Sequence, residues 1–180
     1  MPKFFCDMLD VLRLRFKPLS SYVYPSWQPL AWLVLIGVIG GVDAQVFKTG
    51  VIERIAFFVT LNLAEALLLS VWLMVWWRYV LKRPVQGSLF PLVTLATSVQ
   101  LLELFTRLLP DDIALYAAVS LAFYGVFVLM SSVAAALNEK RGTVLLALLA
   151  YLPAAMGLFQ IAMGMALKWS WIDLSTLPAQ

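Results

Sequence analysis

Five apolar stretches, each long enough or nearly long enough to cross a lipid bilayer, fill almost all of the 180 residues. A helix needs about 20 apolar residues to span the roughly 30 Å hydrocarbon core of a membrane. Hydrophobic residues make up 63% of the chain and charged residues only 13%, in agreement with that pattern. We therefore expect an all-α fold, a polytopic membrane helical bundle that forms a single membrane domain over residues 1–180.

Polar and aromatic residues between the apolar stretches set the bounds of the expected helices. Lipid offers no partner for a free backbone N–H or C=O group, so each stretch should be helical. The expected transmembrane helices cover residues 29–44, 55–77, 89–109, 113–137 and 143–167. The short links between them favour antiparallel neighbours.

Residues 4–17 precede the first span and have a different pattern. Apolar side chains recur there at helical spacing, and acidic and basic side chains fall between them. The pattern predicts a short N-terminal amphipathic helix that ends before Pro18. Two placements suit it: an interfacial helix whose apolar face lies in the headgroup region, or a helix whose apolar face packs on the bundle.

Lys and Arg are distributed unevenly between the two sides of the expected bundle, nine against four, which by the positive-inside rule predicts a cytoplasmic N-terminus and an external C-terminus. On the N-terminal side lie Lys3, Arg13, Arg15, Lys17, Arg78, Lys82, Arg83, Lys140 and Arg141. On the other side lie Lys48, Arg54, Arg107 and Lys168.

Polar side chains within the expected spans are the strongest indication of a functional site, because ionisable groups in lipid cost several kcal/mol by some measures. The candidates are Asn62, Glu65, Gln100, Glu103, Arg107 and Gln160. Helical spacing places Asn62 and Glu65 on one face of the second span, and places Gln100, Glu103 and Arg107 on one face of the third. The sequence leaves open whether these two faces meet.

Three interpretations of the polar residues remain open. In the first, Glu65 or Glu103 lines a polar cavity, where it carries a proton or holds a cationic ligand. In the second, hydrogen bonds lock the helices together, with Glu65 protonated by burial and Glu103 neutralised by Arg107. In the third, the residues contact a partner protein.

Gly37 and Gly41 lie four residues apart in the first span. Small residues at this spacing allow two helices to approach closely. We expect the pair to serve helix packing within the bundle, although the same pattern can also mediate dimers.

Several classes of activity do not fit the composition. The chain contains no histidine, so histidine-dependent triads and zinc sites of the HExxH kind are excluded. It has no Gly-rich phosphate loop and no basic face for nucleic acid. The single Cys6 has no base beside it in the sequence. We expect a protein that is not an enzyme and has no catalytic residue, metal or cofactor.

Three segments resemble bacterial members of the Yip1 domain family, and the likeness extends over nearly the whole chain. They are FKPLSSYVYPSWQPLAWL (16–33), LKRPVQGSLFPLVTLAT (81–97) and ALNEKRGTVLLALL (136–149). The resemblance implies a five-helix membrane fold and a non-enzymatic role in membrane organisation or trafficking. Eukaryotic members carry a DLYGP-like motif where this chain has YPSWQP, and a longer N-terminal region that binds Rab-type GTPases. GTPase binding is therefore not expected here.

Two functions follow as expectations. The first is a multi-pass protein of the bacterial inner membrane that acts as a scaffold or accessory subunit, binding lipid and a membrane-protein partner or a second copy of itself. The alternative is a small proton-coupled transporter that uses the intramembrane carboxylates.

Overall fold

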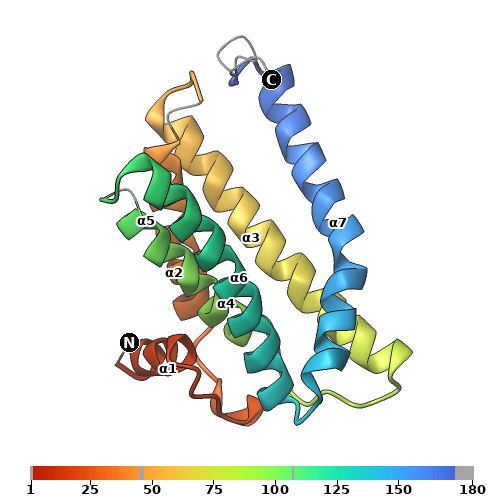
Figure 1. Cartoon of the computed structure of the whole chain (residues 1–180). Coiled ribbons are helices and arrows are strands. Elements are labelled where there is room, and N and C mark those ends of the chain that lie inside the picture. The colour runs from red at the N-terminus through yellow and green to blue at the C-terminus, as the bar shows by residue number, and fades with distance from the viewer. Residues whose placement is uncertain (1, 45–46, 107, 173–180) are drawn as a thin grey trace.

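The computed structural model describes residues 2–44, 47–106 and 108–172, and within these ranges the regular structure is helical apart from one isolated bridge between Phe47 and Ile172. The α-helices are α1 (Pro2–Leu12), α2 (Trp27–Asp43), α3 (Val51–Val75), α4 (Phe90–Thr97), α5 (Glu103–Thr106), α6 (Asp111–Ala136) and α7 (Arg141–Lys168). Figure 1 shows α2, α3, α4–α5, α6 and α7 running in alternating directions between two ends. The helix α1, the loop after α3 and the link from α6 to α7 lie together at one end.

Three helical segments are long and apolar enough to cross a membrane: Val51–Val80, Ile113–Ala136 and Arg141–Lys168. They correspond to the expected spans at 55–77, 113–137 and 143–167, and they support a membrane protein. The expected spans at 29–44 and 89–109 correspond to two shorter apolar helices, Trp27–Val42 and Phe90–Thr106. That these two also cross the membrane stays a prediction.

The third expected span is not one continuous α-helix. A 3-10 helix, η3 (Ser98–Leu102), separates α4 from α5. Hydroxyl side chains precede this change, and they bind backbone carbonyls: Thr94 Oγ1 donates to Phe90 O at 2.9 Å and Thr97 Oγ1 donates to Thr94 O at 2.7 Å. Such bonds compete with the helical hydrogen bonds and bend helices.

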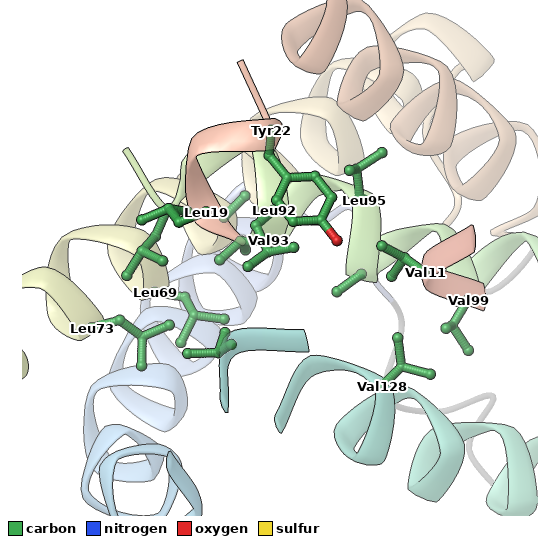
Figure 2. Packing of buried hydrophobic residues seen from close by; sticks show 14 of the residues in the cluster. Val11, Leu19, Tyr22, Leu69, Leu73, Leu92, Val93, Leu95, Val99 and Val128 are labelled. Atoms are coloured by element: carbon green, nitrogen blue, oxygen red, sulfur yellow. The ribbon is translucent and has the colours of Figure 1, made fainter. Parts of the chain in front are cut away.

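The core surrounds α4. The side chains of Leu92 to Ala96 are all buried, so this helix is enclosed on every side, as an apolar helix without a polar face must be. Figure 2 shows how Val11 of α1, Leu69 of α3 and Val128 of α6 gather around it. The core thus holds α1, α3, α4 and α6 together at the end of the molecule where the N-terminus lies.

The N-terminal helix is shorter than its charge pattern indicates: it ends at Leu12 rather than near residue 17. Leu14 has φ 60°, a left-handed conformation that reverses the chain. The reversal brings Lys17 back to α1, where its Nζ lies 2.6 Å from Asp7 Oδ1 and 2.8 Å from Asp10 Oδ2. The apolar face of α1 packs on the bundle through Phe4, which is 2% exposed. Its relation to a headgroup region stays a prediction.

Helices α2 and α3 cross at very short range. A Cβ atom on Gly37 would lie 2.5 Å from Val59 Cα, and one on Gly41 would lie 2.5 Å from Ile55 Cα. No other residue type fits these positions without moving the backbones apart. The two glycines therefore pack within this chain.

Candidate functional site

A cavity of about 380 Å³ lies between α3, α4–α5 and α6. Four of the six polar candidates line it: Asn62, Glu65, Gln100 and Glu103. The rest of the wall is mainly apolar and small, with Ala66, Ala96, Ala122 and Gly125 among its residues. The polar faces of the second and third expected spans thus meet around one space, and Glu65 and Glu103 share it.

Different elements position the four polar side chains. Asn62 and Glu65 come from adjacent turns of α3, whereas Gln100 belongs to the 3-10 helix η3 and Glu103 begins α5. A 3-10 segment inside a helical span is unusual and often marks a functional position. The interruption of the third expected span therefore coincides with the polar wall of the cavity.

The carboxyl groups of Glu65 and Glu103 do not lock the helices together within the described part of the chain. No side-chain hydrogen bond or ion pair joins either group to a described residue, and no described basic side chain lies near either of them. Both side chains, like that of Gln100, are exposed. Their polar atoms are therefore free to contact a ligand or water. Arg107, expected to pair with Glu103, lies outside the described residues.

Glu65 also borders a second cavity, of about 480 Å³, on the side of α3 that faces α7. Gln160 of α7 lines this second cavity, so it lies across α3 from the first group rather than inside it. A third cavity, of about 260 Å³, shares Asn62, Gln100 and Glu103 with the first and extends to α2. Glu65 stands where the first two cavities adjoin.

Helix α7 lines one side of the second cavity. Its first half packs on the bundle through Val144, Ala147 and Tyr151, and its far end is held by a small cluster around Ala166. Between these contacts lies Pro153, which removes a helical hydrogen bond and favours a kink. Leu152 and Met156, on either side of Pro153, are exposed, as are Leu146 and Leu149 before it.

Sequence reasoning did not single out Tyr151 or Pro153. The hydroxyl group of Tyr151 is buried without a hydrogen-bond partner among the described residues, and it is close enough to Glu65 to interact electrostatically. A proline within a long apolar stretch was the available signal for the kink. No local signal marked Tyr151, because its relation to Glu65 depends on how α7 packs on α3.

No family model, curated protein sequence or solved structure matches this chain. The resemblance to the Yip1 domain family stays an expectation drawn from the sequence.

Proposed function

We propose that this chain is a non-enzymatic integral membrane protein that binds a small cationic ligand and exchanges it for a proton. The ligand would bind in the cavity of about 380 Å³ that both Glu65 and Glu103 line, called the acidic cavity below. The observation that carries the proposal is the position of Glu65, which borders both the cavity beside α6 and the cavity beside α7. A group that reaches two adjoining spaces can take a ligand from one and release it to the other.

The chemistry of the cavity favours a cation. A carboxylate at membrane depth is costly unless a proton or a positive charge neutralises it. Proton and cation therefore compete for the same oxygen atoms, and binding of one releases the other. The apolar wall suits a cation with a hydrocarbon body, and the cavity volume lies within the range of small-molecule sites.

Two helix irregularities flank Glu65 and support this function. The 3-10 helix η3 interrupts the third expected span on one side, and Pro153 lies inside the continuous helix α7 on the other. Irregular backbone at membrane depth is tolerated where it lines a cavity or is covered by protein. Discontinuous helices surround the substrate sites of many transporters.

The test uses purified protein and tetraphenylphosphonium, a lipophilic cation, as the probe. Wild-type protein should bind it more tightly as pH rises, and Glu65→Gln should remove both the binding and its pH dependence. Glu53→Gln is the matched control, since Glu53 lies exposed in the first turn of the same helix and lines neither cavity. In proteoliposomes whose membrane potential is clamped at zero, an inward gradient of the probe should drive proton efflux in the wild type and not in protein-free liposomes, because tetraphenylphosphonium crosses lipid by itself without exchanging a proton. Unchanged binding and flux in Glu65→Gln would rule out this function.

A second candidate is a scaffold or accessory subunit, as the resemblance to the Yip1 domain family implies. One observation favours it: α6 presents the aromatic side chains of Tyr116 and Phe123, which are 75% and 73% exposed and two turns apart. Aromatic side chains are common anchors at protein interfaces. In a monomer without a partner, membrane lipid would cover these two side chains instead.

A pull-down from native membranes in mild detergent, followed by mass spectrometry, tests the second candidate. A stoichiometric membrane partner that is lost in Tyr116→Ala/Phe123→Ala supports an accessory subunit, and a second copy of the chain supports a homo-oligomer. Recovery of the chain alone and as a monomer would contradict both. We place the protein in the bacterial inner membrane with the N-terminus in the cytoplasm; the charge distribution supports this placement.

A further inference from the structure

The end of α3 that lies beside the N-terminal helix carries a basic pocket, formed where the helix runs into the loop after it. A cavity of about 460 Å³ lies there, lined by Arg78, Lys82 and Arg83 together with Met74, Pro84 and Val85. Three cations therefore surround one space, and apolar side chains complete its wall.

Of the three cations, Arg83 is already neutralised. Its guanidinium group forms an ion pair with Glu139, from the turn between α6 and α7. Among the described residues, Arg78 and Lys82 have no such acidic partner; Arg78 lies over the ring of Tyr79, 5.9 Å from its centroid. Two positive charges are thus available to an anion at this site.

The backbone around these two residues is irregular. Trp76–Val80 forms a π-helical turn, η2, which carries Arg78, and Lys82 has φ 53°, in the left-handed region. π-helical turns occur frequently at functional sites. A non-glycine residue at positive φ is strained and clusters at such sites as well. Both features lie in the segment that lines the pocket.

The position of the pocket determines which anion can reach it. The π-helical turn that carries Arg78 also carries Trp76, a residue type that collects at the membrane–water interface. Tyr79 and Val80 in the same turn are 67% and 56% exposed. Figure 1 places this end of α3 at the same end of the molecule as α1 and the α6–α7 link. We propose that the pocket binds the phosphate headgroup of an anionic phospholipid, with Arg78 and Lys82 contacting the phosphate and the acyl chains lying along the exposed apolar side chains.

The experiment measures bound lipid on the full-length protein by native mass spectrometry, after exchange into micelles that contain phosphatidylglycerol or phosphatidylcholine. Wild-type protein should retain phosphatidylglycerol in preference to phosphatidylcholine. Arg78→Gln/Lys82→Gly should lower the apparent affinity for phosphatidylglycerol about 25-fold, since each basic residue near a membrane surface contributes roughly fivefold. Glycine is chosen at 82 because φ 53° suits it, so this change removes the charge and relieves the backbone strain. Lys82→Arg should retain binding.

Arg13→Gln/Arg15→Gln is the control of equal charge, since both residues are exposed at the same end of the molecule and outside the pocket. An equal loss of affinity for phosphatidylglycerol in this control would show that binding depends on the total positive charge at this end of the molecule rather than on the pocket. That result would overturn the proposal. No preference for phosphatidylglycerol in the wild type would overturn it as well. Inorganic phosphate is the second probe: displacement of phosphatidylglycerol by phosphate at equal concentration would reassign the pocket to a soluble phosphate. The cation-binding assays on Glu65 do not depend on any of these results.

Discussion

The indole Nε1 of Trp32 donates a hydrogen bond of 2.8 Å to Ser98 Oγ, and both residues are buried. Ser98 is the first residue of the 3-10 helix η3, which carries Gln100 into the acidic cavity. This bond joins α2 to the point where the chain changes from α4 to the 3-10 helix η3. It therefore connects the packing of the bundle to the geometry of the site.

Ser98→Ala tests the importance of this bond. The substitution leaves a buried indole N–H without its partner, so we expect the free energy of unfolding to fall by about 1–3 kcal/mol. Thermal unfolding in micelles of fixed composition gives the change. Ser120→Ala is the matched control, because Ser120 is exposed and bonds only to Tyr116 O within its own helix among the described residues. An effect in Ser98→Ala no larger than in Ser120→Ala would contradict the prediction.

Gly41→Ala should destabilise the bundle. The added Cβ would lie 2.5 Å from Ile55 Cα, so α2 and α3 would have to separate, at a cost of about 1–3 kcal/mol. Gly164→Ala in α7 meets nothing within 4 Å and should stabilise the helix by about 0.5–1 kcal/mol. Unfolding of the two variants side by side measures the difference. Equal free energies of unfolding of the two variants would show that α2 and α3 can separate without loss of stability.

Run length and composition predicted α3, α6 and α7 from the sequence, because the hydropathy of a long apolar stretch is a local property. Helical spacing likewise placed Asn62 and Glu65 on one face of α3. Local patterns could not show that Glu103 shares a cavity with Glu65, since that depends on how two helices pack.

The sequence patterns did not predict the 3-10 helix η3 or the early end of the N-terminal helix, for a related reason. The 3-10 helix η3 begins at Ser98, which accepts a hydrogen bond from Trp32, 66 residues earlier in the chain. The expected helix over 4–17 ends at Leu12 because Lys17 turns back to Asp7 and Asp10, which an amphipathic pattern does not reveal. Tertiary contacts overrode a correct local tendency in both cases.

The polar cluster that holds the N-terminal helix should make its attachment depend on pH. Hydrogen bonds to Asp10 and Asp7 raise the pKa of Lys17 above its ordinary value of 10.5. Burial, together with a hydrogen bond of 2.5 Å to Asp7, raises the pKa of Tyr24. Both groups hold their protons more tightly when folded, so the stability they add is full below their ordinary pKa values. It is lost as pH rises through the raised values.

At acid pH the sign is reversed. The hydrogen bond from Lys17 lowers the pKa of Asp10, so the contribution of Asp10 is present above its ordinary value of 3.8 and is lost as pH falls through the lowered value. The stability difference between wild type and Lys17→Met should therefore be constant from about pH 5 to pH 9 and shrink outside that window. Thermal unfolding across pH measures it, with Lys168→Met as the control. A difference that varies within the window would contradict the assignment.

The single cysteine allows a direct test of whether the acidic cavity holds water. In a Cys6→Ser background, Gln100→Cys places a thiol on the cavity wall and Phe123→Cys places one on α6 away from the cavity, at a position that is 73% exposed. Thr94→Cys, at a position with no exposure, is the buried control. A charged methanethiosulfonate reagent requires both water and an ionised thiol. In proteoliposomes we expect it to modify Gln100→Cys, and to leave the other two at the level of the Cys6→Ser background, because lipid covers position 123. Tetraphenylphosphonium should slow the reaction at position 100, since it occupies the same cavity. Equal modification at positions 100 and 123 would show that the cavity is no more hydrated than the outer face of α6, and would count against an ion-binding site there.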